Sequence, residues 1–127
     1  MRIGSDDSYL CVERVGQEGP KVVWQIEAAI RGFGWKFAAV HDQVRADAGD
    51  DTARQLADFT AHRVQRFEML LLQDGWLRVK RDPEGCILVR YRVGQASTGA
   101  ALEGEVFLKR KPANVFCEEL SGLLRLE

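Results

Sequence analysis

Apolar and polar side chains alternate along residues 21–31, and this alternation constrains the fold more than any other feature of the chain. The apolar positions would share one face of an extended strand: Val22, Trp24, Ile26, Ala28 and Ile30. Gln25, Glu27 and Arg31 would lie on the other face. A period of two residues is typical of a strand that covers a hydrophobic core with one of its faces. The segment therefore predicts a half-buried strand.

Five further segments have the composition or alternation of strands: residues 8–15, 35–44, 76–81, 86–93 and 102–109. In the segment 86–93 we expect four side chains to point inward: Ile87, Val89, Tyr91 and Val93. In the segment 35–44, Trp35, Phe37 and Ala39 lead one face. Residues 94–101 are small and polar, and they predict a loop.

Two segments show helical spacing. Over about residues 52–67, apolar and small side chains recur along one stripe: Leu56, Phe59, Thr60, Val64 and Phe67. Asp50 or Asp51 would cap this helix, with Asp47 nearby in the same acidic turn. Pro112 suits the first turn of a terminal helix. That helix would bury Val115, Phe116, Leu120, Leu123 and Leu124.

The turns between the strands are short, and short turns join antiparallel neighbours. Gly32-Phe33-Gly34 and Asp82-Pro83-Glu84-Gly85 are examples. We expect an α+β fold in the order β-β-β-α-β-β-β-α, with about six strands in a mainly antiparallel sheet and both helices on one face. Leu56, Phe59 and Phe116 would then cover the inward side chains of residues 86–93. A chain of 127 residues suffices for a single domain spanning 1–127.

Targeting and redox features predict a cytoplasmic location. The N-terminal residues contain no apolar run of signal-peptide length, and the longest apolar stretch, residues 69–72, is too short to cross a bilayer. The chain has three cysteines, an odd number, and no C-x-x-C pair. We therefore expect reduced thiols and no association with a membrane.

Motifs of catalysis, cofactor binding and metal binding are missing from the sequence, so we expect no cofactor and no metal. His41 stands beside Asp42, which could orient an imidazole, but no serine or cysteine carries the signature of a nucleophile. The acidic residues near position 50 do not have the order of a calcium-binding loop. The sequence thus argues against an enzyme without deciding the question.

Basic residues gather in one part of a chain whose net charge is −1. Residues 78–111 carry eight basic and four acidic side chains. The candidate binding residues are Arg78, Lys80, Arg90, Arg92, Lys109 and Arg110. They would form a docking surface for an acidic protein partner, or else a solvated sheet face with Glu103 and Glu105 as counter-charges. Nucleic acid is not the expected partner, because the chain has no overall positive field.

The layout of the chain resembles a known type of small bacterial protein. The shared features are a helix with Leu56 and Phe59, the turn and strand Asp74-Gly75-Trp76-Leu77, and the closing helix with Phe116. This layout, from about residue 24 to residue 124, is similar to small bacterial domains of uncharacterised function that are related to immunity proteins encoded beside polymorphic and contact-dependent toxins. The resemblance implies a toxin-binding role and assigns no functional residues.

Two functional hypotheses follow. The first is a non-enzymatic bacterial binding protein, of the immunity type that the resemblance implies, whose partner is a toxin or a second copy of itself. The second is a small-ligand-binding or enzymatic domain with a pocket near Trp24, Trp35 and His41. A pocket lined by these three residues would favour the second hypothesis.

Overall fold

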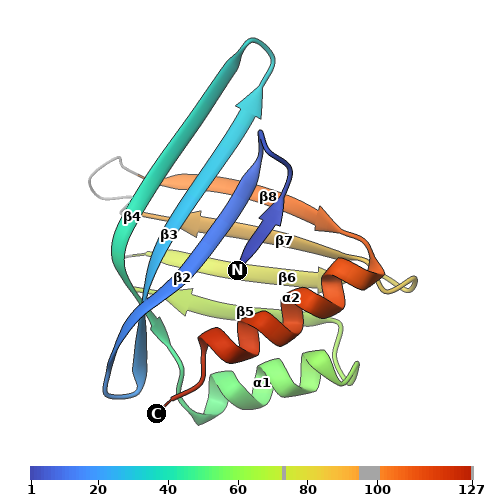
Figure 1. Ribbon diagram of the computed structural model, residues 1–127. Coiled ribbons are helices and arrows are strands. Elements are labelled where there is room, and N and C mark those ends of the chain that lie inside the picture. Colours follow the sequence, from blue (N-terminus) through green and yellow to red (C-terminus); the bar gives the residue numbers. More distant parts are fainter. Residues whose placement is uncertain (73, 95–100, 127) are drawn as a thin grey trace.

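The computed structural model describes residues 1–72, 74–94 and 101–126. The strands are β1 (Arg2–Gly4), β2 (Tyr9–Glu18), β3 (Lys21–Gly32), β4 (Trp35–Asp47), β5 (Arg66–Leu71), β6 (Gly75–Arg81), β7 (Ile87–Val93) and β8 (Leu102–Leu108). Helix α1 (Asp50–Thr60) lies between β4 and β5, and helix α2 (Arg110–Leu123) follows β8. Each strand pairs antiparallel with its neighbour in the sequence, so the sheet runs in the order β1 to β8 (Figure 1).

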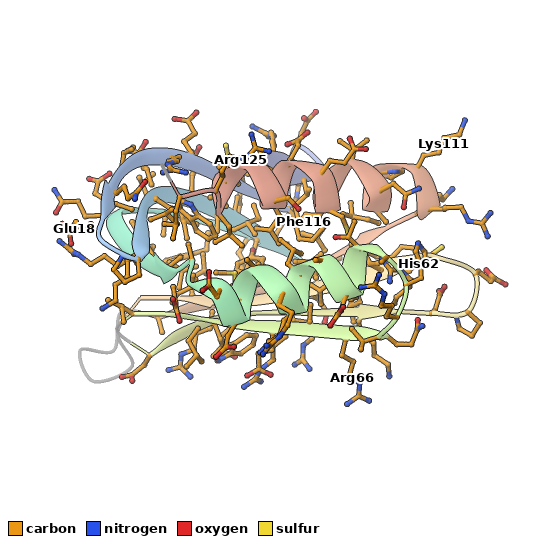
Figure 2. All side chains as sticks on the ribbon, turned by 90° about the horizontal axis from the view of Figure 1, so that it is seen from below. Glu18, His62, Arg66, Lys111, Phe116 and Arg125 are labelled. Carbon is orange, nitrogen blue, oxygen red and sulfur yellow. The ribbon has the colours of Figure 1, made fainter. Side chains whose placement is uncertain are left out.

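The sheet is folded over on itself between β4 and β5. In the part of the chain that the structure describes, Ala46 and Leu71 are the single pair in register between these two strands. Strands β1–β4 form one layer and β5–β8 form the other, and the two helices lie side by side along the opening (Figure 2). Along the chain, each set of four strands is thus followed by one helix.

The expected α+β class and antiparallel sheet are confirmed, whereas the expected strand count is too low. The sheet has eight strands. The two additional strands are β1, which is only 3 residues long, and β5, which begins inside the segment predicted as the first helix. The loop predicted at 94–101 lies largely outside the described residues, since 95–100 are not among them.

Helix α1 is shorter than predicted because it ends at Thr60, not at Phe67. His62 adopts a left-handed backbone conformation, with φ of 62°, which stops the helix. Phe67, Met69 and Leu71 are then buried at every second position of β5. A single apolar residue such as Phe67 fits either period, and pairing with β6 decides in favour of the strand.

Two details of the helices also differ from expectation. The N-cap of α1 is Gly49, whose N–H donates to Asp47 Oδ1. Asp50 and Asp51 lie within the first turn, where their negative charges interact favourably with the helix dipole. In α2 the side chain of Val115 is exposed, not buried.

One continuous hydrophobic core lies between the two layers and the helices. As predicted, Ile87, Val89, Tyr91 and Val93 of β7 are buried in it together with Leu56, Phe59 and Phe116. Alternate positions of β3 are buried in the same core, and Trp24 also donates its indole N–H to the carbonyl of Leu123, at 3.1 Å. This bond fixes the end of α2 on the sheet.

Candidate protein-docking site

Four of the six predicted binding residues lie on the outer face of β6 and β7, as their alternation indicated. Arg78 and Arg90 are directly opposite each other in register, with Lys80 and Arg92 farther along the same face. Like charges placed opposite one another across a sheet are destabilising unless they are compensated.

Glutamates on the neighbouring strands compensate most of these charges. Arg78 pairs with Glu68 at 3.3 Å. Arg90 pairs with Glu105 at 3.8 Å, and Arg92 pairs with Glu103 at 3.1 Å. The outer face is therefore a mosaic of ion pairs with little free charge, which weakens its case as an electrostatic docking surface.

Lys109 and Arg110 do not belong to that face, so the structure does not bring the six residues together. Strand β8 ends at Leu108, and the chain turns into α2 on the inner side of the sheet. Lys109 is the N-cap of α2. Arg110 donates from Nε and Nη2 to the carbonyl of Glu84, at 3.1 and 2.9 Å.

The alternative pocket near Trp24, Trp35 and His41 is not formed by the described residues. Trp24 is enclosed in the core, whereas Trp35 lies at the far end of the same hairpin, opposite Gly32. Eight residues of extended strand separate Trp24 from Gly32, which amounts to roughly 26 Å. His41 does line a cavity of about 110 Å³ with Leu71 and other residues, but neither tryptophan contributes to it.

The β3–β4 hairpin instead presents aromatic side chains to solvent. Phe33 is fully exposed, and Trp35 and Phe37 are 55% and 54% exposed. Figure 1 shows this hairpin extending beyond the other strands. Because Ala46 is the first β4 position that pairs with β5, the described residues of β5–β8 leave the outer end of the hairpin uncovered. We call residues 31–40 the aromatic hairpin.

Glycine shapes the tip of this hairpin. The indole of Trp35 lies over Gly32, where a Cβ would be only 2.2 Å from the indole Cε2. Gly34 has φ of 77°, a conformation that favours glycine. The ring of Trp35 is thus held against the backbone, which presents it in a defined orientation.

The outer edge of β4 is also open along the aromatic hairpin. On one side, residues 35–40 pair with β3. On the other side, the described residues provide no neighbouring strand. Lys36 is the only charged side chain in this stretch. Protein edges of this kind are usually shortened, covered or charged, because their free N–H and C=O groups pair readily with another strand.

Trp35 and Phe37 share one face of their strand as predicted, and this is the face that contains the buried Ala28 and Trp24. Their exposure depends on where the opposite layer ends, which local alternation does not reveal. Phe33 carried a usable signal, because a large aromatic between two turn glycines rarely reaches a core.

A group of possible metal ligands lies in the β6–β7 turn. Asp82, Glu84 and Cys86 offer ligand atoms within 4.8 Å of one another. Asp82 Oδ1, however, already accepts the backbone N–H groups of Glu84 and Cys86, at 2.9 and 3.0 Å. Asp82 Oδ1 therefore stabilises the turn.

Comparisons with known proteins identify no relative of this chain. No family model, curated protein or solved structure matches the chain significantly. Among the described helices, none is both long and apolar enough to cross a membrane. The three cysteines are unpaired, with Cys117 buried and Cys11 and Cys86 partly exposed.

Proposed function

We propose that this chain is a non-enzymatic binding protein that docks an extended segment of a protein partner along the aromatic hairpin. The observation that carries the proposal is the coincidence of exposed Trp35 and Phe37 with an open strand edge. Exposed apolar side chains that cluster on a soluble protein usually mark a binding surface, and tryptophan is enriched among the residues that dominate binding energy.

The open edge supports a particular mode of binding. An extended segment can add a strand to a sheet, so that backbone hydrogen bonds provide affinity and alternate side chains provide specificity. Here Trp35 and Phe37 would contact every second side chain of the added strand.

The chemistry of the hairpin defines the partner segment. Its inner face calls for apolar side chains opposite Trp35 and Phe37. Lys36 has no ion pair among the described residues, whereas Arg31 is paired with Asp7 at 2.7 Å. We therefore expect an apolar segment that carries a carboxylate opposite Lys36.

We further propose that the protein acts in the bacterial cytoplasm. The resemblance implies that the partner is a toxin, which the protein would neutralise by binding it. We place docking on the aromatic hairpin in preference to Arg78, Arg90 and Arg92, because those three side chains are engaged by glutamates. The outer face is then a solvated surface, the second of the two interpretations of the basic cluster.

A co-purification experiment with matched variants tests the proposal. In the variant Trp35→Ser/Phe37→Ser the hairpin loses the two aromatic side chains of its inner face, while Phe33 at the tip remains. The control Leu70→Ser/Phe107→Ser removes apolar side chains of similar exposure, 66% and 59%, from the outer face. We expect the same partner to be retained by the parent and by the control and to be lost by the hairpin variant. Retention by the hairpin variant would refute the proposal.

A further inference from the structure

A second surface, independent of the aromatic hairpin, lies where the end of α1, the β6–β7 turn and the start of α2 meet. Six polar residues line a cleft of about 640 Å³ there: His62, Gln65, Arg81, Asp82, Arg110 and Asn114. Figure 2 shows His62 and Lys111 at the same end of the molecule, where α1 ends and α2 begins.

The floor of this cleft contains a buried arginine. The side chain of Arg81 is only 6% exposed, and its guanidinium lies 4.0 Å above the ring of Phe59. Nη1 donates to the carbonyl of Phe59 at 2.7 Å. No carboxylate of the described chain forms an ion pair with Arg81. Burial of a charge without a counter-charge is costly.

The end of α1 compensates this charge only in part. The carbonyl of Phe59 belongs to the last turn of the helix, where the helix dipole provides about half a negative charge. Arg81 has five N–H donors, and the bond to Phe59 uses one of them. The guanidinium also interacts with the thiol of Cys117, and its positive charge, which no carboxylate of the described chain pairs, belongs to the lining of the cleft.

The start of α2 adds positive charge to the same cleft. Lys109 is the N-cap and Arg110 and Lys111 are the first two helical residues, and of these three cations Arg110 lines the cleft. The first turn has no acidic residue, and the N-cap makes no side-chain hydrogen bond. Cations at the N-terminal end of a helix are unfavourable, because the helix dipole is positive there. This arrangement is the opposite of that in α1, which begins with Asp50 and Asp51.

The other lining residues fit an anion as well. Arg110 is held against the β6–β7 turn by two bonds to the carbonyl of Glu84. Among the described residues that line the cleft, Asp82 is the only one with a carboxylate, and its Oδ1 is engaged by the backbone of the turn. His62, Gln65 and Asn114 supply further polar groups.

We propose that this cleft binds a phosphate group, with Arg81 at its floor and Arg110 at its wall. A guanidinium offers paired donors in a plane, which match the oxygen atoms of a phosphate, and a helix N-terminus favours negative charge. The phosphate group can be free inorganic phosphate or part of a phosphomonoester.

Calorimetric titration of the full chain with inorganic phosphate tests the site, with chloride at matched ionic strength as the reference. The variant Arg110→Ser removes an exposed side chain of the site and is expected to retain the fold. Arg54→Ser is the matched control, because Arg54 is an exposed arginine in the first half of α1. We expect saturable binding that Arg110→Ser weakens roughly tenfold, about 1.4 kcal/mol, and that Arg54→Ser leaves unchanged.

A parallel titration with phosphoserine distinguishes the two sources. Tighter binding of phosphoserine would assign the site to a phosphorylated ligand, and equal or weaker binding would assign it to free phosphate. Arg81→Met, checked for folding by circular dichroism, is expected to abolish binding of both. The proposal is overturned if phosphate has no effect beyond that of chloride, or if Arg110→Ser binds phosphate as well as the parent does.

Discussion

Tyr91 of β7 lies directly opposite Gly104 of β8, and its hydroxyl occupies the place of the side chain that position 104 lacks. A Cβ at Gly104 would be only 2.4 Å from Tyr91 Oη. Tyr91 is buried, and this burial raises the pKa of its hydroxyl. The close fit of the Tyr91 side chain over Gly104 favours this register of β7 and β8.

The Tyr91–Gly104 contact predicts coupled effects on stability. Tyr91→Ala should lower the free energy of unfolding by ~3 kcal/mol because it leaves a cavity in the core. Gly104→Ala should cost ~1–3 kcal/mol, because the new methyl group collides with the tyrosine. In the double variant the collision is absent, so the two costs should not add. Urea unfolding of the three variants measures this, and strict additivity would show that the two residues do not interact.

The ion pair between Glu18 and Arg45 predicts a pH dependence of stability. Arg45 donates to both carboxylate oxygens of Glu18, at 2.6 and 3.0 Å, and these bonds hold the pKa of Glu18 below its usual value of 4.5. A carboxyl with a lowered pKa in the folded state contributes stability above its unfolded pKa, and this contribution is lost as the pH falls through the folded value.

Glu18→Gln should therefore reduce the loss of stability on acidification below pH 4.5. Thermal melting of the parent and the variant between neutral and acidic pH measures the difference. Glu13→Gln is a suitable control, since Glu13 is an exposed glutamate of the same strand. A parent curve that the variant reproduces at every pH would show that the pair contributes nothing.

The outer face of β6 and β7 predicts a small effect of charge reversal. In Arg90→Glu/Arg92→Glu the new carboxylates would lie opposite Glu105 and Glu103. Exposed cross-strand pairs are weak, so the free energy of unfolding should fall by only about 0.5–1 kcal/mol, and partner binding should persist. Pull-down and oligonucleotide titration check this. Tight, salt-sensitive binding of an oligonucleotide by the parent, lost in the variant, would restore the outer face as a binding surface.

The sequence predicted those elements whose alternation or turns are unambiguous. The strict period of β3 and β7 placed Trp24 and Tyr91 in the core, and the Asp82-Pro83-Glu84-Gly85 turn joined β6 to β7 as expected. Phe67 was misplaced because one apolar residue satisfies both a helical and a strand period. Strand β1 was missed because its 3 residues are too few to show a pattern.

The candidate site was less predictable, because it depends on contacts between distant segments. Alternation placed Arg78 and Arg90 on one face, but the register with β5 and β8 decides that glutamates neutralise them. The exposure of Trp35 depends on how far β5 extends along β4. Arg81 did carry a signal, since it follows Leu77 and Val79 at every second position and therefore points inward.

Photo-crosslinking at single positions tests the docking surface most directly. A benzoylphenylalanine at Phe33, which is fully exposed at the tip, reports on the aromatic hairpin, and the same residue at Phe107 reports on the outer face. We expect a covalent adduct with a partner protein from position 33, lost in the Trp35→Ser/Phe37→Ser background, and none from position 107. An adduct from position 107 alone, or from neither position, would contradict docking at the hairpin. An adduct of twice the chain mass from position 33 would identify a second copy as the occupant and refute a separate partner.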